Sequence, residues 1–181
     1  MAKHKKNGIG ILGGTFDPAH KGHVKISKIA IRKLRLKKIY WVVTKKNPFK
    51  KKPLYSLENR LTIAKKIIKN IKNIQILYLD DVIKSSRTID IIQYLIKKKK
   101  YKKLHLIIGS DILTEFERWK SWKKIVKYSK LIVFSRKGYD RKCRETVVTK
   151  YLINKNKILF IKNKPIQISS SILRKKLIKN N

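Results

Sequence analysis

Short apolar segments that alternate with helical patterns constrain the fold of this chain more than any other feature. Buried strands are expected at residues 8–12, 39–43, 74–79, 104–108, 131–134 and 158–161. Helices are expected at residues 24–36, 57–71, 88–96, 112–116, 122–128 and 145–153, and from Ser170 onward. This alternation favours βαβ units, so the sequence predicts an α/β fold with a mostly parallel sheet and helices on both faces. In such folds ligands bind at the carboxyl ends of the strands.

The length of the chain, 181 residues, fits one domain with a sizeable core. The sequence contains no internal repeat and no linker, so we expect a single domain over residues 8–181 after a basic tail, residues 1–7. No apolar run approaches the roughly 18 residues that a membrane-spanning helix needs. One cysteine, Cys143, excludes an intramolecular disulfide and suits a reducing compartment. These features predict a cytoplasmic protein with no membrane partner.

The chain is strongly basic, with 49 Lys and Arg residues, 10 Asp and Glu residues and a formal net charge of +39. A nucleic-acid-binding surface normally gathers its cations on one face, whereas lysines here occur in every segment. Lys and Ile are abundant while Gly, Ala and Pro are scarce, as in proteins encoded by A/T-rich genes. We therefore expect no specific nucleic-acid partner. A non-enzymatic nucleic-acid-binding protein remains the alternative from another functional class.

The string Gly8-x-Gly10-x-x-Gly13 matches the dinucleotide-binding pattern GxGxxG, but its position in the chain is wrong for that function. The pattern belongs in the turn after a strand, with an acidic residue about 20 positions later. Here the first two glycines lie in or before the strand, and no acidic residue occurs between Asp17 and Glu58. We reject a dinucleotide-binding fingerprint at this place.

A stronger signal follows the first strand, in the segment Gly13-Gly14-Thr15-Phe16-Asp17-Pro18-Ala19-His20-Lys21-Gly22-His23. Two glycines let a ligand approach the backbone closely, and amide donors at the start of a helix favour an anion. His20 and His23 can present imidazole N–H donors to the same group. No third ligand is clustered with them in the sequence, so we predict a phosphate-binding turn and no metal ligands.

This segment resembles the GGTFDPxHxGH signature of the nicotinate-nucleotide adenylyltransferase family, which belongs to the nucleotidyltransferases with an HxGH motif. Three later segments resemble further motifs of that family: Arg87-Thr88-Ile89-Asp90, Gly109-Ser110-Asp111 with Phe116-Glu117-Arg118-Trp119, and Ile168-Ser169-Ser170-Ser171-Ile172-Leu173-Arg174. Four motifs in the right order are more specific than any one of them. The resemblance implies a Rossmann-like α/β domain.

The resemblance also implies a reaction in which nicotinate mononucleotide attacks the α-phosphorus of ATP, giving nicotinate adenine dinucleotide and pyrophosphate. No protein nucleophile is needed, because the protein has to position two anions and stabilise charge on phosphoryl oxygens. His20 and His23 are the expected catalytic residues. Mg²⁺ is the expected cofactor, bound mainly through the phosphates of ATP.

The family motifs assign further residues to the two substrates. The residues implied to bind ATP are Gly13, Gly14, Thr15, His20, His23, Gly109, Asp111, Arg136, Ile168, Ser169, Ser170 and Arg174. The residues implied to bind the mononucleotide are Thr15, Phe16, Lys50, Thr88 and Trp119. Arg174 is expected to contribute only if its side chain turns inward, and Trp122 is as compatible with helix packing as with ligand contact.

Several of these residues also have structural interpretations. Asp17 is typical of an Asx turn that fixes its own loop. Thr88 and Asp111 are typical helix N-caps, before Ile89 and Ile112 respectively. These roles do not exclude ligand contacts.

The sequence departs from the family pattern at three places. Arg136-Lys137-Gly138 stands where Arg-Pro-Gly is common, residues 47–50 replace the usual Pro-Pro-His-Lys string, and Ser171 replaces Thr. Phosphopantetheine adenylyltransferase is an alternative because it shares the early loop and an ISSS ending, although its loop usually lacks the first histidine. A preference for nicotinamide mononucleotide and the oligomeric state both stay open.

Overall fold

The computed structural model describes residues 8–47, 52–163 and 168–179 of the chain. The chain divides into two compact units, the first made of residues 1–86 and 167–181 and the second of residues 87–166. Within the described residues, no helix is both long and apolar enough to cross a membrane. The basic tail, residues 1–7, and Lys50 lie outside the described residues, so the predictions made for them stay predictions.

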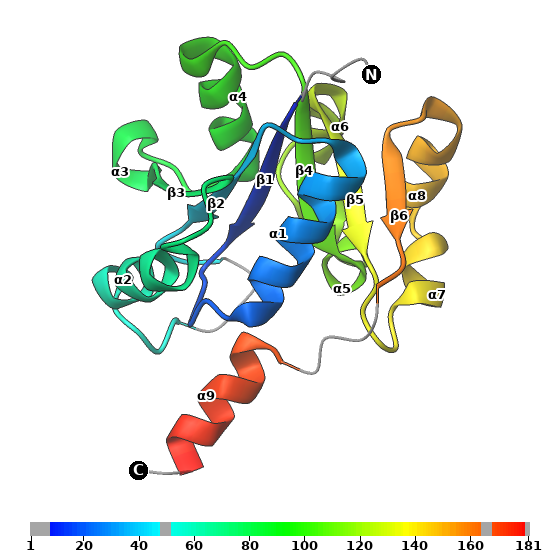
Figure 1. The fold of residues 1–181 in the computed structure, drawn as a ribbon. Coiled ribbons are helices and arrows are strands. Elements are labelled where there is room, and N and C mark those ends of the chain that lie inside the picture. The colour runs from blue at the N-terminus through cyan, green and yellow to red at the C-terminus, as the bar shows by residue number, and fades with distance from the viewer. Residues whose placement is uncertain (1–7, 48–51, 164–167, 180–181) are drawn as a thin grey trace, which may run out of the picture. The chain divides into compact units, whose positions relative to one another are not determined.

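The first unit contains three parallel strands in the order β3-β2-β1 (Figure 1). Its elements are β1 (Ile9–Gly14), α1 (Lys21–Leu34), β2 (Lys38–Val43), α2 (Leu57–Ile68), β3 (Ile74–Tyr78), α3 (Asp80–Ile83) and α9 (Ser170–Lys179). Gly14 pairs with Val43, and Val43 pairs with Tyr78, so the three strands end at the same edge. The segments that follow the strands therefore begin next to one another.

The second unit contains three more parallel strands, in the order β4-β5-β6. Its strands are β4 (Leu104–Gly109), β5 (Ser129–Phe134) and β6 (Ile158–Ile161). Its helices are α4 (Thr88–Lys99), α5 (Ser110–Leu113), α6 (Trp122–Tyr128), α7 (Asp140–Arg144) and α8 (Val147–Leu152), with 3₁₀ turns η1 (Phe116–Arg118) and η2 (Ile153–Lys155). Gly109 pairs with Phe134, so β4 and β5 also end level with each other.

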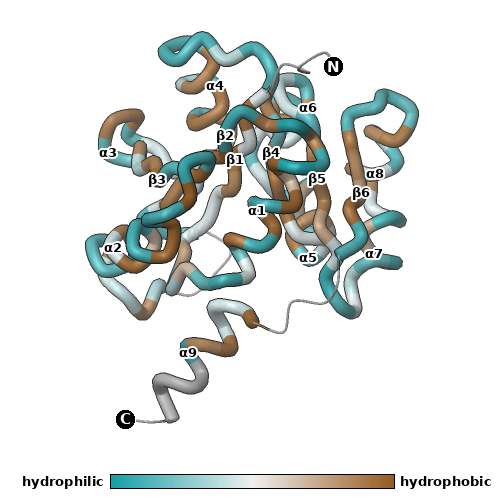
Figure 2. The backbone as a smooth tube through the Cα atoms, in the orientation of Figure 1, coloured by the Kyte–Doolittle hydropathy of each residue, from teal (hydrophilic) through white to brown (hydrophobic). Residues whose placement is uncertain are grey.

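Nearly every residue of the central strands is buried, which is typical of parallel strands covered on both faces. All residues from Ile39 to Val43 in β2 and from Leu104 to Ile108 in β4 are buried. Figure 2 shows β5 and β6 as mainly hydrophobic, whereas α1 and α2 alternate between hydrophobic and hydrophilic residues. The predicted α/β class with parallel strands is confirmed.

Local sequence signals placed most elements correctly, and the exceptions have physical causes. Ser56 caps α2, the helix expected from residue 57, since its Oγ accepts the amide N–H of Asn59 at 3.1 Å. The N-cap predicted at Thr88 is wrong, because Thr88 is already helical and Arg87 is the cap residue. The helix predicted at residues 145–153 begins later than expected, at Val147, because Thr146 is extended and its hydroxyl caps α8 by accepting the amide of Thr149.

Candidate active site

The segment from the end of β1 to the start of α1, residues 13–20, belongs to the motif that most strongly predicts a binding site, and we call it the first loop. A Cβ atom at Gly13 would meet no described atom within 4 Å, so a ligand can approach this backbone closely. The loop leads directly into α1, a helix of 14 residues whose N-terminal amides and dipole favour negative charge. The local geometry is thus that of an anion-binding turn.

His20 and His23 form a reciprocal cap at the start of α1. The Nδ1 atom of His20 accepts the amide N–H of Gly22 at 3.1 Å, and Nδ1 of His23 accepts the amide N–H of His20 at 3.2 Å. Their ring centroids lie 3.9 Å apart. Because each Nδ1 accepts a hydrogen bond, the proton of each neutral ring is on Nε2. The backbone therefore selects the tautomer in which both rings donate through Nε2.

Phe16 anchors the first loop to the sheet. Its backbone is left-handed, with φ of 48°, and its side chain is buried. The ring stacks on Trp41 of β2 with centroids 5.1 Å apart and lies 4.8 Å from the ring of His23. The indole N–H of Trp41 in turn donates to Ser27 Oγ in α1 at 2.9 Å. A ligand would therefore meet the backbone of Phe16 rather than its side chain.

Asp17 connects the first loop with two distant segments, and the Asx turn predicted for it is wrong. Its carboxylate, only 3% exposed, accepts the amide N–H groups of Leu54 and Tyr55, each at 2.9 Å. Nη1 of Arg174 donates to the carbonyl of Asp17 at 2.7 Å and lies 3.3 Å from its carboxylate. The partners of Asp17 are thus at least 37 positions away along the chain.

The start of α9 contacts the first loop through the motif at residues 168–174. Ser169 caps the helix by accepting the amide of Ile172 at 3.3 Å, and α9 begins at Ser170 as expected. Ser170 Oγ donates to the carbonyl of Pro18 at 2.9 Å. Arg174 turns toward Asp17 and also donates to Ser171 Oγ at 3.1 Å. The structure therefore brings two predicted motifs together that lie about 150 residues apart in the sequence.

No motif in the sequence singles out Arg60, whose side chain is 2% exposed. Its guanidinium donates to four carbonyl oxygens, those of Thr15 at 2.6 Å, Thr44 at 2.7 Å, Lys45 at 3.1 Å and Tyr55 at 3.2 Å. Burial lowers the pKa of Arg60 from its ordinary value, although an arginine remains protonated. The helical spacing could have indicated that Arg60 is buried, because positions 60, 64 and 68 form one buried stripe of α2.

Two neighbouring carboxylates after β3 hold Lys45. Asp80 is buried, and its Oδ2 accepts the amide N–H of Lys45 at 2.7 Å, whereas Oδ1 has no hydrogen-bond partner among the described residues. Burial raises the pKa of Asp80. Asp81 is exposed and accepts Nζ of Lys45 at 2.5 Å and the hydroxyl of Tyr78 at 2.8 Å. The hydrogen bond from Lys45 lowers the pKa of Asp81.

In the second unit, three of the predicted residues gather where β4 and β5 end. Nε of Arg136 lies 3.5 Å from Oδ1 of Asp111, and the amide of Arg136 donates to Ser110 Oγ at 2.8 Å. A Cβ atom at Gly109 would collide with Oδ1 of Asp111, so a larger residue here would displace this carboxylate. The N-cap role predicted for Asp111 is wrong, because α5 begins at Ser110 with Gly109 as its cap residue.

Asp140 stabilises the segment that contains Arg136. Burial would raise the pKa of Asp140, but hydrogen bonds from Ser110, from Ser135 and from the amide of Arg136 together hold this pKa below its ordinary value. Its contribution to stability is therefore complete above the unfolded pKa of about 3.9 and is lost as the pH falls through the lower, folded value.

Asp140→Asn should accordingly lower the melting temperature at pH 6, and the difference from wild type should shrink as the pH falls below about 4. Thermal unfolding followed by circular dichroism between pH 3 and 6 measures this. Glu117→Gln, at an exposed carboxylate of the same unit, is the control and should show no such difference. A constant difference between Asp140→Asn and wild type across this range would contradict the assignment.

The predicted aromatic ligand, Trp119, follows the η1 turn. Phe116 is fully buried and stacks on Trp119 with ring centroids 4.9 Å apart and planes inclined by 29°. Trp119 is itself only half-buried, so its ring is partly accessible. Trp122 instead packs edge-on against Tyr151 at 5.3 Å, which supports the helix-packing interpretation for that residue.

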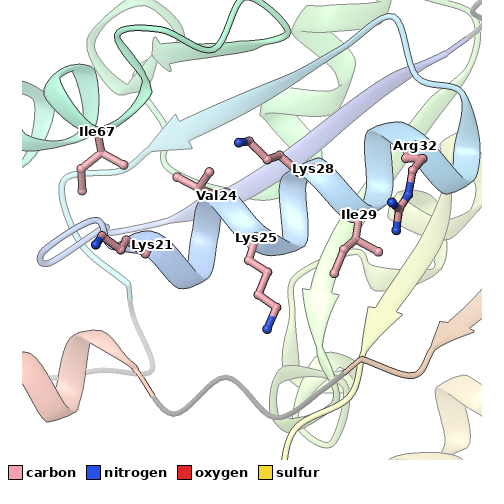
Figure 3. A pocket seen from close by; sticks show the side chains of 7 residues that line it. All are labelled: Lys21, Val24, Lys25, Lys28, Ile29, Arg32 and Ile67. Carbon is pink, nitrogen blue, oxygen red and sulfur yellow. The ribbon is translucent and has the colours of Figure 1, made fainter.

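A broad groove lies along α1 in the first unit. Its volume is about 750 Å³, and Figure 3 shows the side chains that line it: Lys21, Val24, Lys25, Lys28, Ile29, Arg32 and Ile67. None of the residues predicted to bind a substrate lines this groove. The candidate active site is therefore defined by the loops at the strand ends and not by this groove.

Comparison with known proteins identifies the family of this chain. A family model described as "Cytidylyltransferase-like" matches residues 11–176. A chain of Pelagibacter ubique (strain HTCC1062), named "Probable nicotinate-nucleotide adenylyltransferase", is 48% identical over 171 residues, which are 94% of each chain. A protein of the same name from Clostridium acetobutylicum is 33% identical over 178 residues, covering 94% of this chain and 86% of the relative. This chain belongs to the nicotinate-nucleotide adenylyltransferase family.

A solved structure shares the fold of this family member. It is described as Plasmodium falciparum nicotinic acid mononucleotide adenylyltransferase complexed with NaAD, and it has a TM-score of 0.73 and 23% sequence identity. The match covers 97% of this chain and 86% of the other. The predicted Rossmann-like fold and the family resemblance are both confirmed.

The described residues of this nicotinate-nucleotide adenylyltransferase family member contain no group of three or more His, Cys, Asp or Glu side chains that could hold a metal ion. The carboxylate of Asp17 already accepts two amides and faces Arg174. The Nδ1 atoms of His20 and His23 accept backbone amides. The first loop thus offers hydrogen-bond donors to a ligand rather than oxygen ligands to a cation.

Proposed function

We propose that this protein transfers the adenylyl group of ATP to the phosphate of nicotinate mononucleotide, forming nicotinate adenine dinucleotide and pyrophosphate. The observation that carries the proposal is the pair His20 and His23, whose Nδ1 atoms both accept backbone amides at the start of α1. Two Nε2 donors at a helix N-terminus suit an anion that gains charge during the reaction. Membership of the family and the relative at 48% identity support the same function.

In the proposed mechanism, the acceptor phosphate attacks the α-phosphorus of ATP in line, and pyrophosphate leaves. His20 and His23 donate to the oxygens of the α- and β-phosphates, where negative charge develops. The backbone of Gly13, Gly14 and Thr15 lines the phosphates from the sheet side. Because the protein contributes no nucleophile, catalysis rests on positioning and on charge stabilisation.

The remaining residues divide between the two substrates. We assign Ile168, Ser169 and Ser170 at the start of α9 to the terminal phosphates, because a helix N-terminus offers amides and hydroxyls to an anion. Arg174 adds positive charge near the first loop while it holds Asp17. Gly109, Asp111 and Arg136 are assigned to the adenosine, and Thr88, Trp119, Phe16 and Lys50 to the mononucleotide.

Mg²⁺ fits this arrangement as a cation carried by ATP. The donor-rich first loop has no cluster of carboxylates to hold it, so the phosphates and water would supply its ligands. When bound there, the cation neutralises charge on the phosphates.

The acceptor profile tests the proposed function. We expect pyrophosphate release from ATP and Mg²⁺ with nicotinate mononucleotide, and much slower release with nicotinamide mononucleotide or phosphopantetheine. A coupled pyrophosphate assay with the three acceptors in parallel measures this. Release with phosphopantetheine alone would contradict the proposal, and so would binding of nucleic acid without any turnover.

Trp119→Ala should raise the KM for nicotinate mononucleotide about 10-fold, because stacking of a base-like ring on an aromatic side chain is worth about 1–3 kcal/mol. The KM for ATP should change much less. Steady-state kinetics with each substrate varied in turn provides the measurement. Trp122→Ala is the matched control and should leave the KM for the mononucleotide unchanged, since Trp122 packs on Tyr151. Equal effects of the two substitutions would refute the role of Trp119.

A further inference from the structure

Arg60 connects three segments of the first unit that lie far apart in the sequence. It donates to Thr15 in the first loop, to Thr44 and Lys45 after β2, and to Tyr55 before α2. The first two contacts span 45 and 16 positions of the chain. We propose that Arg60 is a positioning residue for adenylyl transfer, one that sets the direction of the backbone amides in the first loop. This inference rests on the proposed function.

The contact with Thr15 controls a peptide plane. In a trans peptide the carbonyl and the following N–H point in opposite directions. Because the carbonyl of Thr15 points to the buried guanidinium at 2.6 Å, the amide N–H of Phe16 points away from Arg60. Phe16 has a φ of 48°, a conformation that side chains other than glycine adopt rarely. The hydrogen bond from Arg60 on one side and the stacking on Trp41 on the other hold it there.

The contacts with Lys45 and Tyr55 hold the two ends of one segment, residues 45–55. At Lys45 the amide donates to Asp80 while the carbonyl accepts from Arg60. At Tyr55 the amide donates to Asp17 while the carbonyl again accepts from Arg60. The same pattern therefore occurs twice, with a carboxylate on each N–H and one guanidinium on both carbonyls. Asp17 and Asp80 also oppose the effect of burial by raising the pKa of Arg60.

A lysine cannot replace this group. The guanidinium offers five N–H donors in a planar fork, whereas an ammonium group offers three donors from one point. Four carbonyls in different directions match only the fork. A misplacement of about 1 Å in a reacting group can cost about 10²-fold in rate, so loss of the fork should reduce kcat rather than substrate affinity.

The test compares Arg60→Lys with two controls in steady-state kinetics and thermal unfolding. We expect Arg60→Lys to lower kcat by 10-fold or more, with KM values for both substrates within about 3-fold of wild type. Arg32→Lys, an exposed arginine on α1, should behave as wild type. Ala64→Gly, in the same buried stripe of α2, should lower the melting temperature about as much as Arg60→Lys does. Its kcat should stay within about 2-fold of wild type.

A kcat for Arg60→Lys within 2-fold of wild type would overturn the proposal. An equal loss of kcat in Arg60→Lys and Ala64→Gly would overturn it as well. Hydrogen exchange of the wild-type protein, read by mass spectrometry, gives a second measurement that needs no variant. The amides of Lys45 and Tyr55 donate to Asp80 and Asp17 while Arg60 binds the carbonyls of the same two residues, so both amides should exchange slowly. Rapid exchange at either one would show that Arg60 does not hold the ends of this segment, and it would also overturn the proposal. Wild type that exchanges slowly but releases no pyrophosphate with nicotinate mononucleotide would contradict the proposed function alone.

Discussion

His20→Asn and His23→Gln should each lower kcat by about 10²- to 10³-fold while the protein stays folded, because each removes one Nε2 donor from the phosphate site. These substitutions are chosen to keep the cap of α1. Asparagine is a good N-cap acceptor for the amide that His20 now binds, and glutamine at the position of His23 can complete a capping box. The measurement is kcat with both substrates saturating, together with the melting temperature.

His20→Ala provides the matched comparison. It removes the donor and the cap together, so it should lose as much activity as His20→Asn and, in addition, about 1 kcal/mol of stability. If His20→Asn and His23→Gln retained kcat near that of wild type, the phosphate role of both histidines would be wrong. If activity followed the melting temperature across the three variants, the histidines would serve the helix cap and not the reaction.

Asp17→Asn should destabilise the protein by about 2–4 kcal/mol, the largest loss of stability that we expect from an isosteric change in the first loop. The carboxylate is buried and accepts the amides of Leu54 and Tyr55 through its two oxygens. An asparagine turns one of these oxygens into an NH₂ donor that faces another donor, and it leaves Arg174 without its charged partner. Urea unfolding at pH 7 measures the loss.

Glu58→Gln is the control for this experiment, since Glu58 is an exposed carboxylate near the start of α2. It should change the free energy of unfolding by no more than about 0.5 kcal/mol. Arg174→Met tests the same contact from the other side and should destabilise less, because the two amides on Asp17 remain bound. A loss for Asp17→Asn no larger than that for Glu58→Gln would show that the carboxylate does not hold the loop.

Much of the fold follows from patterns that act over a few residues. Short apolar runs predicted all six strands, and Ser56 and Ser169 cap the helices that were expected from residues 57 and 170. Where the predicted start of a helix is wrong, a neighbouring residue forms the helix cap instead. Thr146, for example, shifts the start of the helix expected at residues 145–153 to Val147, because its hydroxyl caps α8 by accepting the amide of Thr149.

The candidate site could be predicted where the residues that form it lie close together in one sequence motif. The segment at residues 13–23 predicted an anion-binding turn with two histidines, and the structure places their rings 3.9 Å apart. It could not predict which nitrogen of each ring would carry the proton, because that depends on which backbone amide each Nδ1 accepts. The roles of the individual substrate-binding residues stay predictions until the kinetic experiments are done.

The sequence by itself determined the order of the strands along the chain and the identity of the first loop, since both depend on periodicity or spacing within about ten residues. Only the tertiary structure decided the partners of Asp17 and Arg60. The hydrogen bonds of Arg60 reach up to 45 positions along the chain and those of Asp17 up to 157, to segments that no local pattern connects. A buried arginine in an apolar stripe has a physical reason only once the carbonyl oxygens that surround it are known.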